Sequence, residues 1–252
     1  MTDQRIHFSA PMVRAILRQI EAPGTGKTQT RRMMPHQDAL ATAYSPIVSG
    51  IRIFNYAGEE EISRSRCSVG DRLWVREEWR TFVSLDDVPP RDLWAPGGER
   101  GAGVLYEADG SGMSLTADCE RVYVSQEIRP AFGKKRMARY MPRWASRLTL
   151  YVTGVRVQRL QDITEEDAWA EGCLRGLRDD VGGFFPAEEP HPSGVGLVGW
   201  DTARGWYADR WDRIKGPGSW DANPWVAAYT FVPIWGNISV LGTLIEETSL
   251  CA

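Results

Sequence analysis

The 252-residue chain has few of the residues that bind metal ions in proteins. Its four cysteines and three histidines form no C-x-x-C pair or other short-spaced set: Cys67, Cys119, Cys173, Cys251, His7, His36 and His191. A structural zinc site needs four ligands at short spacings, and the sequence offers none. We therefore expect reduced, mostly buried cysteines and no metal or other cofactor.

Long apolar runs are also missing. No stretch approaches the ~18 apolar residues that a membrane-spanning helix needs. The N-terminus carries Asp3, Gln4, Arg5 and His7 where a signal peptide would have an apolar run. These absences predict a cytoplasmic protein without a membrane partner. The hydrophobic and charged fractions, 42% and 25%, are ordinary for a globular protein and do not indicate intrinsic disorder.

Acidic residues are absent from 128–147, although the whole chain has a formal net charge of −3. This stretch interleaves seven basic residues with three aromatic ones: Arg129, Lys134, Lys135, Arg136, Arg139, Arg143, Arg147, Phe132, Tyr140 and Trp144. Positive charges pair with phosphates and aromatic rings stack on bases, so the composition suits a protein that binds single-stranded nucleic acid or a flipped base. A solvated basic surface is the alternative, and composition does not decide between the two.

Three segments have the periodicity and the end signals of helices: 11–20, 164–173 and 203–215. The first has a proline at its start, where a missing N–H costs nothing. In the second, Thr164 can cap the helix and Asp167 can complete a capping box. The third places three large apolar side chains on one side: Tyr207, Trp211 and Ile214.

Strands are indicated by alternating or β-branched residues at 72–80, 104–108, 121–125, 148–160 and 225–232. Strands scattered among few helices favour an α+β fold over a doubly wound parallel sheet. On the first strand Glu77 lies on the same face as Val75 and Trp79. A carboxylate on an apolar face needs a partner or a chemical role, so we expect either a buried ion pair with an arginine or a catalytic acid.

The sequence APGTGKT at 22–28 looks like a phosphate-binding P-loop. The full pattern requires glycine at position 21, where this chain has Glu21. A P-loop also follows a buried strand and opens a helix, whereas this segment follows a predicted helix and soon meets Pro35. A carboxylate beside the phosphates would be electrostatically unfavourable. These features argue against an NTPase.

The same residues fit another pattern. A helix that begins near Pro11, followed by KTQTRR at 27–32, resembles the opening of ASCH-domain proteins of the PUA-like superfamily. Four further blocks carry the resemblance: GDRLWVRE at 70–77, MPRWASR at 141–147, QDITEEDA at 161–168 and WDANPWV at 220–226. The first is similar to the family's G-D-x-L-x-V strand, and the others to ASCH proteins that phages and prophages commonly encode.

This resemblance implies an α+β fold, namely a PUA-like (ASCH) β-barrel with flanking helices and long inserted loops. It implies a single domain over 1–252. The insertions fall near 35–66, 81–102 and 174–204, and 234–252 forms a C-terminal extension. In the family, the K-T-x-T-x-R strand lies along one wall of the pocket.

The small ASCH amidohydrolases that deacylate N4-acetylcytidine use a lysine and a threonine of this motif and a glutamate on a following helix. By resemblance, these positions are Lys27, Thr30 and Glu171. A lysine whose pKa is lowered by burial can remove the proton of a threonine hydroxyl, and a carboxylate can orient the pair or shuttle a proton. Arg31 or Arg32 can stabilise an oxyanion or hold a phosphate.

An extended strand over this motif points alternate side chains to opposite sides. One side carries Lys27, Gln29 and Arg31, and the other carries Thr28, Thr30 and Arg32. A twist or bulge at the start of the strand would still let Lys27 and Thr30 share a pocket.

Three functions follow as hypotheses. The first is a hydrolase of the ASCH amidohydrolase type acting on an acylated or otherwise modified nucleoside or nucleobase. The alternative is a non-catalytic module that binds nucleic acid, either RNA or modified-base DNA, in which case Lys27 and Thr30 only hold the ligand and Glu171 is a solvated helix residue. A weaker alternative is a metal-independent ribonuclease. The residues expected to bind substrate or nucleic acid are Arg31, Arg32, Trp74, Arg76, Glu77, Lys134, Lys135, Arg136, Arg139, Tyr140, Arg143 and Trp144.

Overall fold

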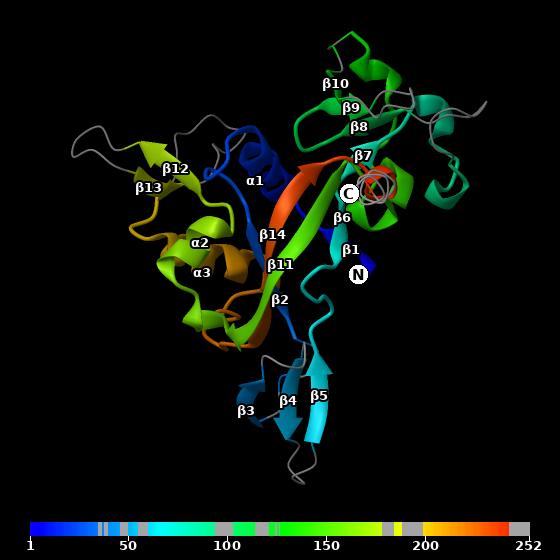
Figure 1. Cartoon of the computed structure of the whole chain (residues 1–252). Helices are drawn as coiled ribbons and strands as arrows, with labels where there is room; N and C mark the ends of the chain where they lie inside the picture. The colour runs from blue at the N-terminus through cyan, green and yellow to red at the C-terminus, as the bar shows by residue number, and fades with distance from the viewer. Residues whose placement is uncertain are drawn as a thin grey trace, which may run out of the picture. The chain divides into compact units, whose positions relative to one another are not determined.

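A computed structural model of the chain describes residues 1–34, 37, 40–45, 50–54, 60–93, 103–113, 121–123, 125, 127–177, 184–187 and 199–241. The fold is α+β, as the sequence predicts (Figure 1). The helices that matter for the site are α1 (Ala10–Glu21), α2 (Glu165–Ala170) and α3 (Ala203–Lys215). None of these described helices is long and apolar enough to cross a membrane.

The largest sheet has five strands in the order β1-β6-β11-β14-β2. Its strands are β1 (Asp3–His7), β2 (Gln29–Met33), β6 (Arg72–Arg76), β11 (Leu148–Arg159) and β14 (Trp225–Trp235). β1 runs parallel to β6, whereas β6 and β11, and β14 and β2, pair antiparallel. The predicted strands at 148–160 and 225–232 are therefore confirmed. The predicted strand at 72–80 is divided into β6 and β7 (Trp79–Arg80).

Three smaller sheets complete the described strands. β7 continues through β8 (Val104–Tyr106) and β9 (Ser111–Met113) to β10 (Arg121–Tyr123). β3 (Leu40–Ser45), β4 (Gly50–Phe54) and β5 (Glu60–Arg64) form an antiparallel sheet, and β12 (Leu174–Leu177) pairs with β13 (Phe184–Ala187). The expectation of loops throughout 35–66 and 174–204 was wrong at these strands.

Short 3-10 helices connect several of these elements. They are Val83–Leu85, Pro90–Asp92, Arg129–Ala131, Ala138–Tyr140, Arg143–Ala145 and Leu160–Asp162. The basic stretch at 128–147 is built largely from such turns, because its prolines and closely spaced charges suit neither a long helix nor a central strand.

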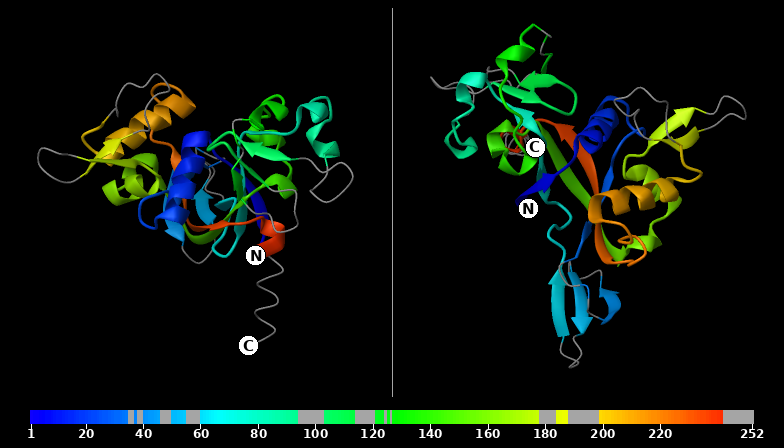
Figure 2. Two further views of the ribbon diagram at one scale, coloured as in Figure 1. Left: turned by 90° about the horizontal axis from the view of Figure 1, so that it is seen from above. Right: turned by 180° about the vertical axis from the view of Figure 1, so that it is seen from behind.

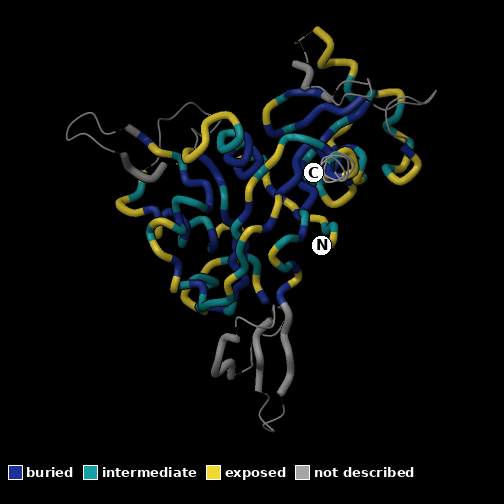
Figure 3. The backbone as a smooth tube through the Cα atoms, viewed as in Figure 1, coloured by how far each residue is buried: buried dark blue, intermediate teal, exposed yellow. Residues whose placement is uncertain are grey.

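The chain divides into two compact units. Unit 1 comprises Met1–Arg14, Arg72–Tyr151 and Pro233–Ala252, and unit 2 comprises Ala15–Asp71 and Val152–Val232. A buried apolar cluster in unit 1 joins six residues: Trp79, Leu93, Val104, Tyr106, Met141 and Ala145. Figure 3 shows buried positions along the central strands and exposed positions mainly in the turns.

In unit 2, α2 and α3 lie side by side (Figures 1 and 2). The side chain of Thr202 caps α3 by accepting a hydrogen bond from the Gly205 amide, at 3.0 Å. The carboxylate of Glu165 accepts hydrogen bonds from the amides of Ala203 and Arg204 and so ties the first turn of α3 to α2. Trp206, Tyr207 and Trp211 of α3 are buried, but the predicted apolar side was wrong for Ile214, which is 63% exposed.

Candidate functional site

The candidate site in unit 2 begins where α1 turns into β2. Gly26 packs against the last turns of α1 so closely that a Cβ atom would lie 2.2 Å from the carbonyl oxygen of Ala15. Next, the amide of Lys27 donates to that carbonyl at 2.9 Å, and the amide of Thr28 donates to the carbonyl of Ala170 in α2 at 2.9 Å. These contacts fix the backbone of the KTQTRR motif between two helices.

Lys27 and Glu171 form a buried ion pair. The Lys27 Nζ donates to the Glu171 Oε2 at 2.6 Å and to the Glu171 carbonyl oxygen at 2.7 Å, although the residues are 144 positions apart. The two residues are 1% and 3% exposed, so Glu171 is not the solvated helix residue of the binding-only hypothesis. Burial lowers the pKa of the Lys27 amine to about 8, while the negative charge of Glu171 opposes this shift.

Arg31 holds the other oxygen of the same carboxylate. Its Nη1 lies 3.0 Å from Glu171 Oε1, and its Nη2 lies 2.8 Å from Asp167 Oδ2. The arginine therefore bridges two carboxylates that are four residues apart at the end of α2. Gln29 supports it, because the Gln29 Oε1 accepts a hydrogen bond from Arg31 Nη1 at 2.6 Å. As predicted, Lys27, Gln29 and Arg31 point to one side of the strand.

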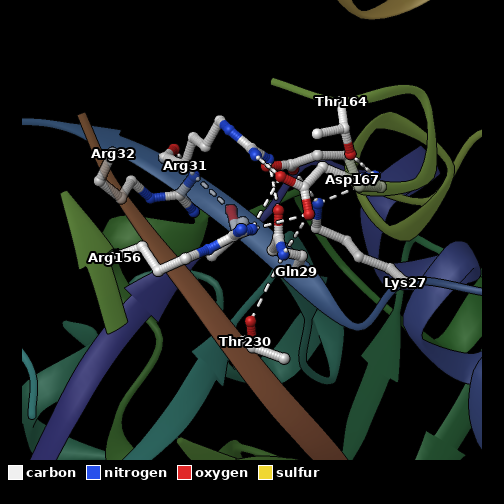
Figure 4. A network of polar contacts seen from close by, with 10 residues as sticks. Lys27, Gln29, Arg31, Arg32, Arg156, Thr164, Asp167 and Thr230 are labelled. Carbon is white, nitrogen blue, oxygen red and sulfur yellow. Dashed lines mark hydrogen bonds and ion pairs between the residues drawn. The ribbon is translucent and has the colours of Figure 1, made fainter. Parts of the chain in front are cut away.

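Asp167 is the centre of a wider polar network (Figure 4). It accepts hydrogen bonds from Gln29, Arg31 and Arg156. Burial alone would raise the pKa of Asp167, but hydrogen bonds from Arg156 and Gln29 and the charges of the two arginines lower it below its ordinary value. The Asp167 amide donates to the capping Thr164 side chain at 3.1 Å, so the predicted cap is confirmed. The Asp167 carboxylate was expected to complete a capping box, but it bonds to Gln29, Arg31 and Arg156 instead.

Tyr207 of α3 lies next to Arg31 in the site. The Arg31 guanidinium lies 5.8 Å from the centre of its ring. Burial, followed by the negative charge of Glu171, raises the pKa of the Tyr207 phenol well above its ordinary value. The phenol therefore stays protonated at neutral pH and can donate a hydrogen bond. An ionised Glu171 carboxylate, in contrast, is only an acceptor.

Thr30 lies with its hydroxyl against Arg32. The Arg32 Nη1 donates to the Thr30 Oγ1 at 2.9 Å and to the Arg31 carbonyl at 3.1 Å. Thr30 is 1% exposed and is paired in register with Tyr229 of β14. Of the three predicted catalytic residues, the described contacts join Lys27 to Glu171 and join Thr30 to Arg32.

Glu77 forms a buried ion pair in unit 1. Its two carboxylate oxygens each accept a hydrogen bond from Arg147 at 2.8 Å, and Arg147 also contacts Asp109. Burial raises the pKa of Glu77, although the charge and hydrogen bonds of Arg147 partly offset the rise. The expectation of an ion pair with an arginine is therefore confirmed. Glu77 has its carboxylate turned to Arg147, not to a ligand.

Apart from Arg31 and Arg32, the remaining predicted binding residues also belong to unit 1. Trp74 is buried and carries the Arg76 guanidinium 4.7 Å above its ring. Trp144 packs against the apolar cluster of unit 1, so core packing accounts for it. Arg143 forms an ion pair with Asp3. Five members of the basic stretch line one groove: Lys134, Lys135, Arg136, Arg139 and Tyr140.

Asp167, Arg156 and Tyr207 belong to the unit 2 site but were missed as site residues. Asp167 was expected only to complete a capping box. Its spacing of four residues from Glu171 places both carboxylates on one side of the α2 end, and this spacing was the available signal. Arg156 and Tyr207 lie on a strand and a helix whose sequences suggest only packing.

The described residues hold no group of three or more His, Cys, Asp or Glu side chains that could bind a metal ion. The site is instead a set of paired cations and carboxylates around one buried lysine with a lowered pKa. Such a set can transfer a proton and stabilise a negative charge. No family model, curated protein or solved structure matches this chain.

Proposed function

We propose that the chain is an amidohydrolase that removes an acyl group from a modified nucleoside or nucleobase, with Lys27, Thr30 and Glu171 as its catalytic residues. We further propose that the five-stranded sheet belongs to a PUA-like barrel of the ASCH type. The observation that carries the proposal is the buried contact of 2.6 Å between Lys27 Nζ and Glu171 Oε2. A lysine with a pKa of about 8 is partly uncharged near neutral pH and can act as a base.

In the proposed reaction, the Thr30 hydroxyl passes its proton through a water molecule to the neutral amine of Lys27, because the contacts above join Thr30 to Arg32 and Lys27 to Glu171. The Thr30 oxygen attacks the amide carbonyl carbon in the same step. The C–N bond then breaks, the leaving amine takes the proton from Lys27, and the acyl group remains on Thr30 as an ester. Water hydrolyses this ester, which restores the hydroxyl and releases the carboxylic acid. Glu171 orients the lysine throughout and stabilises its charged form.

The two arginines of the motif would have different roles. Arg31 is engaged with Glu171 and Asp167, so it positions the carboxylates. Arg32 donates to the Thr30 hydroxyl oxygen, so its guanidinium lies beside the atom that would attack. We assign Arg32 to stabilising the oxyanion that forms on the substrate carbonyl.

Hydrolysis of N4-acylcytidines by the full chain tests the proposal. Cytidine release would be measured by chromatography with N4-acetylcytidine and with longer N4-acyl chains. Lys27→Arg keeps a positive charge next to Glu171 but cannot give up its proton, so we expect a loss of at least ~100-fold. Lys215→Arg, an exposed change in α3, is the matched control and should keep the wild-type rate.

Two results would refute this function. One is the absence of cytidine release from every acyl substrate by wild-type protein with a normal unfolding transition. The other is a Lys27→Arg variant that is as active as Lys215→Arg. Glu171→Gln provides a second check, because loss of the carboxylate should also slow the reaction.

A further inference from the structure

Unit 1 contains a groove that the proposed reaction does not use. It has a volume of about 420 Å³ and lies between residues 86–90 on one wall and 134–140 on the other. We call it the unit 1 groove. Four of the seven basic residues of the stretch line it, together with Tyr140 and two prolines, Pro89 and Pro90.

The walls of the groove are held together by hydrogen bonds. Arg136 is 6% exposed, and its guanidinium donates to the carbonyl oxygens of Leu85 at 2.7 Å and Val88 at 3.2 Å. Its backbone pairs with Trp79. The carboxylate of Asp86 accepts a hydrogen bond from the Lys134 amide at 2.9 Å. Arg136 and Asp86 thus build the groove, and it exists before any ligand arrives.

The rim of the groove combines exposed charge with exposed stacking surface. Tyr140 is 53% exposed and Met137 is 55% exposed, which is high for large apolar side chains. The Arg139 guanidinium lies 4.8 Å from the centre of the Tyr140 ring. An arginine stacked on an exposed tyrosine presents a flat surface with a positive charge, and nucleobases stack on such surfaces.

The acidic partners on this rim are held weakly. Lys134 lies 4.0 Å from Asp87 and Lys135 lies 3.2 Å from Glu78, and all four side chains are at least 38% exposed. Exposed pairs of this kind contribute little to stability, so phosphate groups can replace the carboxylates at little cost.

Positive charge continues beside the groove. The Arg76 Nη1 donates to the Arg139 carbonyl oxygen at 2.7 Å. Burial and then the like charge of Arg5 lower the pKa of Arg76. Arg76 therefore adds a positive charge beside the groove.

We infer that the unit 1 groove binds single-stranded nucleic acid. Lys134 and Lys135 contact phosphates, and the stacked pair of Arg139 and Tyr140 receives a base. An acidic peptide would use the lysines but would not use the exposed ring. A double helix would present phosphates but no unstacked base. This inference is independent of the hydrolase proposal, because every residue in it belongs to unit 1.

The test is fluorescence anisotropy of labelled twelve-nucleotide dT and rU strands titrated with the full chain at 50 and 200 mM salt. The affinity should fall as the salt concentration rises, because each phosphate contact releases a counterion. Each such contact steepens the slope of the logarithm of the binding constant against the logarithm of the salt concentration. The double variant Lys134→Ala/Lys135→Ala should bind about tenfold more weakly, with a salt slope reduced by ~1–2. Tyr140→Ala should weaken binding by about tenfold and leave the salt slope unchanged.

The matched control removes the same charge from an exposed site in unit 2. Arg213→Ala/Lys215→Ala should bind like wild type. The inference is overturned if neither strand binds at 50 mM salt, or if the control loses as much affinity as the Lys134/Lys135 variant. It is also overturned if poly-glutamate or duplex DNA competes as well as the single strands, or if Tyr140→Ala binds normally.

Discussion

Among single residues, Lys27 is the one on which the proposed function depends most. A buried ammonium group is costly unless it is paired, and here Glu171 accepts from it with both a carboxylate oxygen and the main-chain carbonyl oxygen. Arg31 holds the second oxygen of that carboxylate, so Glu171 cannot turn away. Burial lowers the pKa of the amine to about 8, and the pairing with Glu171 opposes that shift while it holds the amine in place.

This lysine makes stability depend on pH in the alkaline range. The folded pKa is about 8 against an ordinary value of 10.5, so between these values the unfolded chain binds a proton that the folded chain does not. Raising the pH through this window therefore favours folding. Compared with Lys27→Met, we expect wild type to gain up to ~3 kcal/mol in the free energy of unfolding across the window. Urea unfolding at several pH values would measure it. A constant difference between the proteins would contradict the shifted pKa.

Thr30 gives a second test at a single side chain. Thr30→Ser keeps the hydroxyl beside Arg32, whereas Thr30→Val keeps the shape and removes the oxygen. If the hydroxyl is the nucleophile, the serine variant should retain acylcytidine hydrolysis within about tenfold, and the valine variant should lose at least ~100-fold. Steady-state rates would show this. Equal rates for the two variants would mean that the Thr30 hydroxyl is not the nucleophile.

At the level of elements, α2 matters because it orders both carboxylates of the site. Its first turn is capped by Thr164, whose side chain accepts from the Asp167 amide. Thr164→Ala should lower the free energy of unfolding by about 1 kcal/mol, and Thr164→Ser should restore most of that loss. Thermal unfolding would measure both. An alanine variant as stable as wild type would show that the contacts of Asp167 alone hold this turn.

The helices and the long strands were predictable because local physics fixes them. α3 was predicted from Ala203 to Lys215 and is observed there, since Thr202 caps its start and Gly216 ends it at a φ of 106°. β12 and β13 were missed. The segment is rich in glycine and proline, and β13 contains Pro186, a residue that normally argues against a strand. A two-stranded hairpin tolerates it because it has no central strand.

The site was predictable only in part. Alternation along an extended segment placed Lys27, Gln29 and Arg31 on one side, and the structure agrees. Nothing local connects Lys27 to Glu171, because the contact spans 144 residues, so that pairing was expected only from resemblance. Tyr207 could not be found from sequence, because a tyrosine in an apolar helix face is usually a packing residue.

For the whole molecule, partly buried ion pairs in both units set the response to acid. Burial opposes the ionisation of Asp109, but the charge of Arg147 and hydrogen bonds from Arg147 and Ser111 lower its pKa below the ordinary value. Asp167 behaves in the same way in unit 2. Each carboxylate contributes stability that is present above its unfolded pKa and is lost as the pH falls through the lower folded value.

We therefore expect the chain to be stable at pH 5 and to lose stability steeply below about pH 4, where these carboxylates gain protons. Asp109→Asn and Asp167→Asn should each be less stable than wild type at pH 6. Their deficits should shrink as the pH falls towards ~2. Denaturant unfolding at four pH values would measure this. A deficit that stays constant with pH would mean that the two ion pairs do not control acid stability.

The rate of N4-acetylcytidine hydrolysis as a function of pH reports whether a neutral Lys27 is the base. We predict a rate that rises about tenfold per pH unit below about pH 8 and levels off above it, together with residual activity in Lys27→Arg that lacks this rise. Wild-type protein that releases no cytidine at any pH, or a Lys27→Arg variant with the wild-type profile, would contradict the account.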